Sequence, residues 1–486
     1  MINCFIPFLS LPQARQTVRA LGLCDRIKNI YLLATEKIPD EVEGCEMLMI
    51  DSPASTATFR TIALHADTAY TLLYTKYTAF EPGQFAFERL LAIAGDTNAG
   101  MLYADRYLLK NGNSQQAPVI DYQKGSLRDD FDFGSLLFFR SSVLKQAVRA
   151  MDADYRFAGL YDLRLRVSEL AELVHVNEYL YSEVETDIRK SGEKLFDYVD
   201  PKNRAVQIEM EAVCTAYLKR VGGYLAPDFE PVTFDAGGFE QEASVIIPVR
   251  NRIRTIEDAI RSVLAQKTTF RFNLIIVDNH STDGTSEAIG KYTADGRVVH
   301  LVPERSDLGI GGCWNVGVHH PACGKFAVQL DSDDVYSGPD TLQKIVDAFY
   351  EQNCAMVVGT YRMTDFKMNE IPPGIIDHRE WTLENGRNNA LRINGLGAPR
   401  AFYTPVLRRI NLPNTSYGED YALGLRISRT WRIGRIYDVL YLCRRWDDNS
   451  DASLDVVKMN GHNLYKDRIR TWELQARVAM NKKNKK

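Results

Sequence analysis

An acidic cluster, Asp331-Ser332-Asp333-Asp334, is the sharpest chemical pattern in the sequence. It follows a run of apolar residues, which predicts that the carboxylates of Asp331 and Asp333 stand at the end of a buried strand, within reach of one hard cation. Mg²⁺ or Mn²⁺ held in this way can bridge a diphosphate and neutralise the charge that grows as a nucleoside diphosphate leaves. The alternative is a helix N-terminus decorated with acidic residues, which needs no ligand.

Continuous apolar runs predict the elements that position this cluster. Residues 243–249 (ASVIIPV) and 273–278 (NLIIVD) have the pattern of strands buried on both faces. Between them, Thr255 is predicted to cap an amphipathic helix over residues 256–264. Strand, helix and strand form a βαβ unit, whose right-handed crossover places the loops after the strands at one edge of a parallel sheet. Ligand sites are expected at that edge.

The elements that follow continue the alternation. Strands are predicted over residues 298–304, 325–334 and 355–362, and helices after the glycine-rich turn at 308–312 and over 341–350. That turn lacks the GxGxxG spacing of a dinucleotide site, so it either shapes a nucleotide pocket or is a tight turn packed on the sheet. Residues 364–397 contain Pro372-Pro373 and several glycines, and are predicted to form a long irregular stretch that holds binding loops.

Four motifs in this order resemble those of the family 2 glycosyltransferases of the GT-A fold. They are ASVIIPVRNR from residue 243, LIIVDNHSTDGT (274–285), QLDSDD (329–334) and YGEDYALGLRIS (417–428). The resemblance covers about residues 243–446. It implies a metal-dependent enzyme, using Mn²⁺ or Mg²⁺, that takes a sugar from a nucleotide-diphosphate sugar with inversion.

The same resemblance implies roles for individual residues. Asp331 and Asp333 match the Asp-x-Asp that binds the donor ribose and the diphosphate-bound metal, and Asp420 matches the general base. Glu419 would orient the acceptor or the base. The nucleotide-sugar site would contain Pro248, Arg250, Asn251, Asp278, Asn279, Asp331 and Ser332, and the acceptor side would contain Gly397, Ala398 and Arg400.

A physical argument supports the base. An inverting transfer needs a carboxylate opposite the leaving diphosphate to accept the proton of the attacking hydroxyl, and Asp420 would do this in one step. The alternative is that Asp420 caps the helix predicted over residues 421–431.

Two positions depart from the family pattern. Trp446 stands near the place where many members have a His that completes the metal shell, so Asp447, Asp448, the more distant His462 or water would take that place. Asn279 stands where many members have another Asp, so its contact with the base or ribose carries no charge.

The first half of the chain is a faint repeat of the second. Residues 4–8, 30–35, 69–83, 100–107, 133–140 and 159–168 correspond in order to the motif-bearing segments of the second half, which indicates a tandem pair of similar folds. The first copy lacks the chemistry, because residues 74–77 (YTKY) replace the acidic cluster, and Gly159 and Leu160 fall where Glu419 and Asp420 lie.

The predicted fold is therefore α/β, with two tandem GT-A-like, Rossmann-like domains of mostly parallel sheet and a C-terminal helical segment. We expect a degenerate, non-catalytic domain over residues 1–222, a Gly- and Pro-containing linker over 223–242, the catalytic domain over 243–452, and a helical extension with a basic tail over 453–486.

Composition narrows the partners. The 486 residues include 59 Lys and Arg against 63 Asp and Glu, a net charge of -4 that gives no reason to expect nucleic acid as a partner. The sequence shows no long apolar run and no signal peptide, so a cytoplasmic location is expected, with peripheral attachment to the inner face of the membrane and a homodimer left open. The eight cysteines have no paired spacing, which predicts buried, reduced thiols.

The main hypothesis is a metal-dependent inverting glycosyltransferase that moves a sugar, with a UDP-sugar favoured, to a hydroxyl of a glycan or lipid-linked glycan. One alternative is a non-catalytic carbohydrate-binding or assembly protein built on the same fold. Another is a sugar-phosphate nucleotidyltransferase, which the sequence disfavours because neither half begins with a Gly-rich triphosphate loop.

Overall fold

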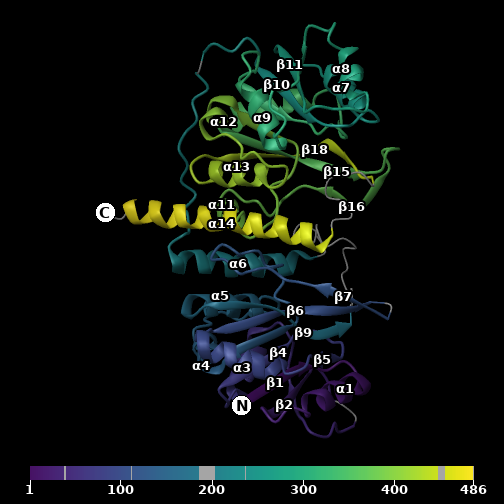
Figure 1. Cartoon of the computed structure of the whole chain (residues 1–486). Coiled ribbons are helices and arrows are strands. Elements are labelled where there is room, and N and C mark those ends of the chain that lie inside the picture. Colours follow the sequence, from purple (N-terminus) through teal and green to yellow (C-terminus); the bar gives the residue numbers. More distant parts are fainter. Residues whose placement is uncertain (38–39, 111, 185–202, 236, 447–454, 485–486) are drawn as a thin grey trace. The chain divides into compact units, whose positions relative to one another are not determined.

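The computed structural model describes residues 1–486 except 38–39, 111, 185–202, 236, 447–454 and 485–486 (Figure 1). The chain divides into two compact units. Among the described residues, the first unit comprises 1–184, 204–223 and 455–474, and the second is made mainly of 224–446 and 475–484.

The second unit is an α/β structure. Its strands are β10 (Ala243–Val249), β11 (Phe272–Asp278), β12 (Val298–Leu301), β13 (Phe326–Gln329), β14 (Val335–Tyr336), β15 (Met356–Thr364), β16 (Glu370–Ile376), β17 (Arg400–Tyr403) and β18 (Ile433–Arg444). Its helices are α7 (Ile256–Leu264), α8 (Thr285–Gly290), α9 (Ile310–His319), α10 (Thr341–Gln352), α11 (Gly386–Asn389), α12 (Thr404–Ile410) and α13 (Glu419–Ser428).

These strands form one mixed sheet in the order β12-β11-β10-β13-β17-β15-β18-β14, with β16 paired to β15. Strands β12, β11, β10 and β13 are parallel, and β17 joins β13 in the antiparallel direction. The central strand β10 is covered on both faces, so Val245, Ile246 and Ile247 are fully buried. Burial of each such side chain contributes about 1.5–3 kcal/mol, which explains why the apolar runs of the sequence become the middle of the sheet.

The first unit repeats this architecture. Its elements are β1 (Ile2–Pro7), α1 (Leu11–Leu21), β2 (Ile27–Ala34), β3 (Glu46–Met49), α2 (Thr56–His65), β4 (Tyr70–Tyr74), β5 (Phe80–Pro82), α3 (Ala86–Thr97), β6 (Met101–Lys110), β7 (Asn113–Ala117), β8 (Leu136–Arg140), α4 (Ser141–Arg149), α5 (Gly159–Leu170), β9 (Leu173–Val184) and α6 (Arg204–Val221).

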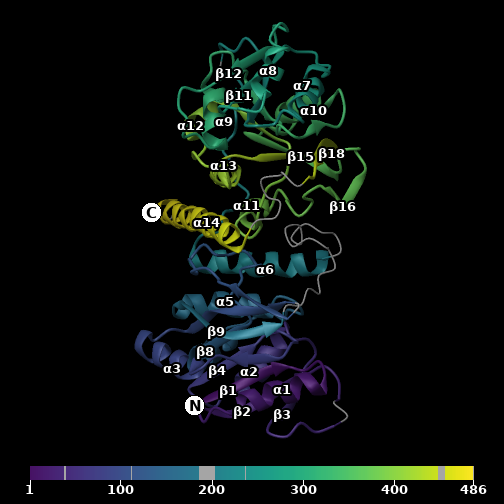
Figure 2. The same ribbon diagram turned by 45° about the vertical axis from the view of Figure 1, so that its right-hand side comes forward.

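The two sheets correspond strand by strand. The order β3-β2-β1-β4-β8-β6-β9-β5, with β7 on β6, is the order of the second sheet with each strand replaced by its counterpart. The directions agree as well, since β1 is parallel to β2 and β4, and β4 is antiparallel to β8 (Figure 2). The predicted tandem α/β fold is confirmed.

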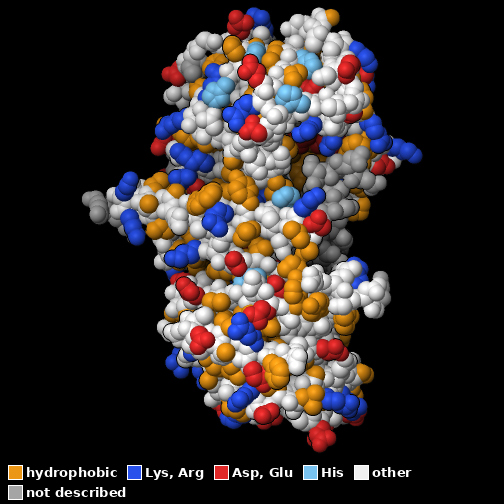
Figure 3. All heavy atoms as spheres, in the orientation of Figure 1, with side chains coloured by type: hydrophobic (Ala, Val, Ile, Leu, Met, Phe, Trp, Pro, Cys, Tyr) orange, Lys and Arg blue, Asp and Glu red, His pale blue; other side chains and the backbone are white. Residues whose placement is uncertain are grey.

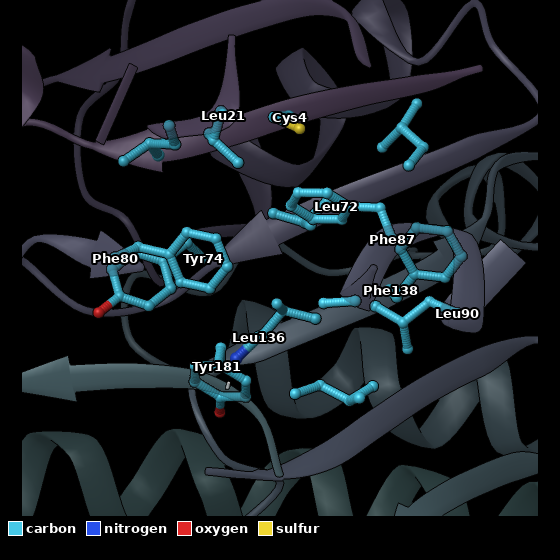
Figure 4. Packing of buried hydrophobic residues seen from close by; sticks show 14 of the residues in the cluster. Cys4, Leu21, Leu72, Tyr74, Phe80, Phe87, Leu90, Leu136, Phe138 and Tyr181 are labelled. Carbon is cyan, nitrogen blue, oxygen red and sulfur yellow. Dashed lines mark hydrogen bonds between the residues drawn. The ribbon is translucent and has the colours of Figure 1, made fainter. Parts of the chain in front are cut away.

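One face of the first sheet carries an aromatic core (Figure 4). The ring of Phe80 lies 5.1 Å from that of Tyr74 and 5.6 Å from that of Tyr181, between centroids. Cys4 and Leu72 of neighbouring strands complete this layer and are fully buried. The first unit therefore has a hydrophobic core of its own.

Helix α14 (Val456–Asn484) is the predicted C-terminal helix. Within the first unit, its Asp467 is fully buried, accepts a hydrogen bond from Ser126 at 3.0 Å and pairs with Arg470 at 2.8 Å. Within the second unit, the side-chain amide of its Asn481 donates to the carbonyl of Tyr224 at 2.7 Å. Trp472 of the same helix is 56% exposed.

Two local expectations were wrong. Residues 364–397 are not wholly irregular, because they contain β16 and α11; the prolines are tolerated because β16 pairs only with β15 at the side of the sheet. The side chain of Thr255 does not cap α7. Its hydroxyl donates instead to the carbonyl of Ser332 at 2.9 Å, which ties the start of α7 to the acidic loop.

The charge distribution on the surface and the state of the cysteines agree with what the composition predicts. Basic and acidic side chains are intermixed on the face of each unit shown in Figure 3. All eight cysteines are free, and five of them are buried. In the described part of the chain, no helix combines the length with the apolar character needed to cross a membrane.

Candidate active site

The loops that follow β10, β11 and β13 meet at the carboxyl edge of the parallel strands, as the βαβ pattern predicts. Asn251, after β10, accepts a hydrogen bond from the backbone N–H of Thr282 at 2.8 Å, and its own N–H donates to Ser281 at 2.9 Å. Asn251 has a φ of 54°, a left-handed conformation that asparagine tolerates better than most residues. This residue fixes one loop against the next.

The acidic loop follows β13 and is held from two neighbouring strands. The backbone N–H of Asp331 donates to the hydroxyl of Tyr441 on β18 at 3.1 Å, and the amide of Gln329 donates to the Asp331 carboxylate at 2.9 Å. Gln329 also accepts the backbone N–H of Arg400 on β17 at 3.1 Å. Burial raises the pKa of Asp331 against the opposing charge of Arg400, and the charge of Asp333 raises it further. A cation at this place would relieve that repulsion.

Asp333 lies among hydrogen-bond donors. The indole N–H of Trp446 donates to its Oδ2 at 3.2 Å, and Arg252 Nε lies 3.9 Å from the same oxygen. Arg444 on β18 also holds the loop. Its backbone N–H donates to the Asp334 carboxylate at 2.7 Å, and its Nε–H donates to the carbonyl of Asp333 at 2.5 Å. Trp446 therefore reaches the predicted metal position, but as a donor to a carboxylate and not as a ligand.

Helix α13 brings a second pair of carboxylates. Glu419 and Asp420 occupy its first turn, after Gly418 with a φ of 79°. The guanidinium of Arg400 on β17 contacts Asp420 Oδ2 at 2.6 Å, and its charge also acts on Asp331 and Glu419. Arg400, predicted on the acceptor side, thus connects the acidic loop with the predicted base.

The carboxyl group of Glu419 is buried and has a raised pKa. Burial, the charge of Asp420 and the charge of Asp331 together raise the pKa of Glu419 from an ordinary 4.5 to about 8, while Arg400 opposes the rise. Its Oε2 atom is buried and has no hydrogen-bond partner. Glu419 therefore retains its proton at neutral pH in the ligand-free protein.

The predicted donor-side residues fall into two groups. Pro248, Arg250 and Asn251 lie at or after the end of β10, where Arg250 and Asn251 are exposed. Asp278, by contrast, has a side chain only 1% exposed, and it accepts hydrogen bonds from the backbone of Ser281 at 2.9 Å and from the Ser286 hydroxyl. Burial raises the pKa of Asp278, but these hydrogen bonds outweigh it and the pKa is lowered.

Asn279 and Ser332 are buried beside that loop. The amide group of Asn279 donates to the carbonyl of Leu308 at 2.8 Å, which leaves its buried Oδ1 without a partner. The carbonyl of Ser332 accepts the hydroxyl of Thr255.

Two of the predicted acceptor-side residues have structural contacts. Gly397 has a φ of 100°, and a Cβ there would lie 2.7 Å from the ring of His378, so only glycine fits. Its carbonyl accepts a hydrogen bond from Arg400 at 2.9 Å, which orients the guanidinium toward Asp420. Ala398 is half-buried in the same loop.

The glycine-rich turn at 308–312 is explained by close packing. A Cβ on Gly311 would lie 2.0 Å from the carbonyl of Pro413, and the Gly311 N–H donates to Thr415 at 2.9 Å. The start of α9 is thereby held against the loop that leads into α13. The turn positions Glu419 and Asp420 through the backbone.

The donor set suits a hard cation in part. Asp331 and Asp333 offer carboxylate oxygens, which Mg²⁺ and Mn²⁺ prefer, and such ions commonly keep waters. Within the described ranges, however, no group of three metal-ligating side chains is found. Asp447 and Asp448 lie outside the described residues, and His462 belongs to α14 in the first unit, so the second unit does not itself bring it to Asp333. The described residues therefore offer two protein ligands, Asp331 and Asp333, and water and phosphate oxygens would supply the others.

Sequence reasoning missed three residues of the site. Gln329 and Tyr441 orient the acidic loop, and Arg444 supports it from β18. Gln329 stands within the QLDSDD motif, so its position was a usable signal. Tyr441 and Arg444 lie more than a hundred residues further along the chain, and only strand pairing shows that they reach the loop.

The proton on Glu419 has a measurable consequence for stability. Folding raises its pKa to about 8, whereas an unfolded chain releases this proton near 4.3, so the folded state binds more protons between those values. The free energy of unfolding should therefore fall as pH rises from about 4.3 to about 8. Glu419→Gln removes this contribution, and the difference in stability between variant and wild type should increase in favour of the variant across the window.

Urea unfolding at several pH values measures this difference. The same change at the exposed Glu351 on α10 is the matched control. A constant difference between Glu419→Gln and wild type from pH 5 to pH 8 would show that the Glu419 carboxyl is not held neutral by its surroundings.

Comparison with known proteins finds similarity to one family over part of the chain. Residues 244–409 match the family model described as glycosyl transferase family 2. An uncharacterized glycosyltransferase of Rickettsia conorii is 38% identical over 200 residues, which cover 40% of this chain and 32% of that protein. The putative teichuronic acid biosynthesis glycosyltransferase TuaG of Bacillus subtilis is 33% identical over 120 residues, which cover 25% of this chain and 46% of that protein. The chain thus spans less than half the length of these two relatives.

Two solved structures are similar as well. The Staphylococcus aureus TarS fragment 1–349, in complex with UDP-GlcNAc, has 22% sequence identity and a TM-score of 0.38, covering 49% of this chain and 72% of that chain. Glucosyl-3-phosphoglycerate synthase from Mycobacterium tuberculosis, in complex with Mn²⁺, UDP and phosphoglyceric acid, has 20% identity and a TM-score of 0.34, covering 49% of this chain and 79% of that chain.

Proposed function

We propose that the second unit, whose residues 244–409 match the family model described as glycosyl transferase family 2, transfers a sugar from a nucleotide-diphosphate sugar, preferably a UDP-sugar, to a hydroxyl of a glycan or lipid-linked glycan. One observation carries the proposal. Arg400 contacts the carboxylate of Asp420 and acts on that of Asp331, so the predicted base and the predicted metal site share one charged cluster.

Asp420 is the general base of the proposed reaction. The acceptor oxygen forms a bond to the anomeric carbon as the bond from that carbon to the diphosphate breaks, and the electron pair leaves with the diphosphate. The hydroxyl proton passes to the Asp420 carboxylate, which stands on the side of the sugar opposite the leaving group, so the configuration inverts. A base must be ionised before it accepts a proton, and the contact with Arg400 favours the ionised form.

Asp331 and Asp333 would hold the divalent cation, Mn²⁺ or Mg²⁺. When bound, the ion supplies neutralisation of the charge that develops on the diphosphate. Trp446 and Arg252 fix the Asp333 carboxylate from the other side by hydrogen bonding and charge. In this proposal the indole of Trp446 orients a ligand and leaves the remaining coordination positions to water and phosphate.

The donor nucleotide would lie along the loops after β10 and β11. Asn279 Oδ1 is buried without a partner, so it suits an N–H donor of the base. Asp278 has both oxygens engaged within its loop, and we propose that it positions Asn279 without touching the donor. Pro248, Arg250, Asn251 and Ser332 would complete this side of the site. TuaG is named for teichuronic acid biosynthesis, which favours a polysaccharide as the product class.

Calorimetric titration of the full chain with UDP, GDP and dTDP, each with and without Mn²⁺, tests the proposal. We expect one nucleotide to bind at least tenfold more tightly with Mn²⁺, and the corresponding nucleotide-sugars to be consumed in the presence of an acceptor glycan. Binding of none of the three under either condition would favour the non-catalytic assembly protein.

A further inference from the structure

The first sheet has a carboxyl edge that corresponds to the edge carrying the candidate site in the second sheet. Phe5 of β1 pairs with Leu73 of β4, and Ile246 of β10 pairs with Gln329 of β13. Since Phe5 and Ile246 each stand two residues before the proline that both strands contain, Thr75 occupies the position of Asp331.

The helix that carries the predicted base has a counterpart too. Helix α5 begins at Gly159 where α13 begins at Glu419, so Leu160 occupies the position of Asp420. Both replacements remove a carboxylate, so Thr75 offers a cation no anionic ligand and Leu160 has no group that could accept a proton.

Thr75 and Leu160 nevertheless line a common cavity of about 240 Å³. Its wall is mainly apolar and includes four aromatic residues, Phe131, Phe133 and Phe157, with Tyr161 on α5. The ring centroids of Phe131 and Phe133 lie 4.4 Å apart, and both side chains are buried, so surrounding residues hold this part of the wall in place. The cavity is smaller than the about 300–1,000 Å³ of pockets for drug-sized ligands, and suits a single ring.

Backbone contacts hold the wall in place. The carboxylate of Glu209 on α6 accepts the N–H groups of Phe157 at 2.7 Å and Ala158 at 3.1 Å, immediately before α5 begins. Helix α6 packs on α5 in both ribbon views (Figures 1 and 2). These hydrogen bonds fix the segment before α5, and with it the position of Phe157 in the cavity wall.

The polar lining consists mainly of acceptors. Asp132 is fixed by Arg106 at 3.0 Å and by the N–H of Gly134 at 2.8 Å, and its side chain is 43% exposed. Asp129 is a second carboxylate of the lining. The guanidinium of Arg164 donates to the carbonyls of Ser126 and Arg128, which engages the cation in the fold.

We propose that this cavity binds one neutral sugar ring of the acceptor glycan, without metal and without catalysis. The proposal rests on the proposed function of the second unit for the identity of the glycan. A sugar ring offers C–H faces to the aromatic residues of the wall and hydroxyl donors to the carboxylates and to Thr75. The carboxylates of Asp129 and Asp132 disfavour a nucleoside diphosphate, because Arg106 offsets only the charge of Asp132 and Arg164 is engaged by backbone carbonyls. A purely aliphatic chain would leave those carboxylates facing it.

Saturation-transfer NMR on the full chain tests this site with glucose, galactose, N-acetylglucosamine and cellobiose. The experiment is done without divalent metal and with the Asp333→Ala variant, so that the second unit does not bind a donor. We expect at least one of these sugars to give signals, and Leu160→Trp, which fills the cavity, to lower its affinity at least tenfold.

Matched variants keep the result interpretable. Leu170→Trp adds the same ring at a residue of α5 that is 41% exposed, and should leave the signals unchanged. Thr75→Val and Asp129→Asn preserve shape and should each weaken binding severalfold, which keeps the test valid if Leu160→Trp does not fold. Signals from none of the sugars, or signals that persist in all three cavity variants, overturn the proposal.

The outcome is separable from that of the second unit. Nucleotide binding with Mn²⁺ but no metal-free sugar binding would remove only the cavity proposal. Sugar binding sensitive to Leu160 in a chain that binds no nucleotide would keep the cavity and remove the transferase.

Discussion

Asp420→Asn is expected to lower the rate of sugar transfer by about 10²–10⁴-fold, the usual contribution of a positioned general base. The amide has nearly the shape of the carboxylate and can still accept a hydrogen bond from Arg400, which contacts Asp420 Oδ2 at 2.6 Å in the native protein. It cannot take up the acceptor proton. Initial rates with the donor identified by titration measure the effect.

The affinity for the nucleotide separates loss of the base from loss of the site. Because Asp420 lies on α13 and the acidic loop follows β13, nucleotide binding with Mn²⁺ should change by less than about threefold. Asp438→Asn, at an exposed residue of β18 that pairs with Lys344, is the matched control. Transfer within a few-fold of wild type in Asp420→Asn would assign the proton to another group.

Asp333→Ala should abolish the part of nucleotide binding that depends on Mn²⁺, with a loss of affinity of at least about 100-fold, since even residues that only support metal ligands commonly contribute 10–100-fold. The variant should fold, because Asp334 still accepts the N–H of Arg444 at 2.7 Å and Thr255 still binds the carbonyl of Ser332 at 2.9 Å. Titration of the nucleotide with and without Mn²⁺ measures the loss directly.

Lys76→Ala is the corresponding change in the first unit, beside Thr75 in the segment that replaces the acidic cluster. The ammonium group of a lysine is a strongly hydrated point charge, and no carboxylate stands beside it to hold a metal. Nucleotide affinity should therefore stay as in wild type. Equal losses in the two variants would mean that donor binding is not confined to the second unit. A metal effect that survives in Asp333→Ala would move the cation away from the acidic loop.

The main strands could be predicted from the sequence because the signal is local. Residues 243–249 form a strand because a run such as ASVIIPV is stabilised by burial on both faces wherever it is placed in a sheet. The correspondence of residues 4–8 and 69–83 with the second half predicted a second copy, and the identical strand order confirms it. Pairing direction follows from the connections, so the carboxyl edge of the sheet was predictable as well.

Short elements were less predictable. The stretch 364–397 is rich in loop-forming residues, yet β16 forms there because β15 offers a free side for pairing. Thr255 looked like a helix cap, but the acidic loop provides a carbonyl for its hydroxyl at 2.9 Å. Pairing with the preceding strand outweighed the local preference in the first place, and a carbonyl 77 residues further along the chain did so in the second.

Which residue types stand after β13 and at the start of α13 can be read from the sequence: carboxylates in the second unit, and Thr75 and Leu160 at the matching places in the first. How those carboxylates behave depends on the fold. Arg400 reaches Asp420, while burial and like charges raise the pKa of the adjacent Glu419 to about 8. The physical reason is that strand formation depends on neighbouring residues along the chain, whereas the charge state of a carboxyl group depends on which charges and how little water the fold places around it.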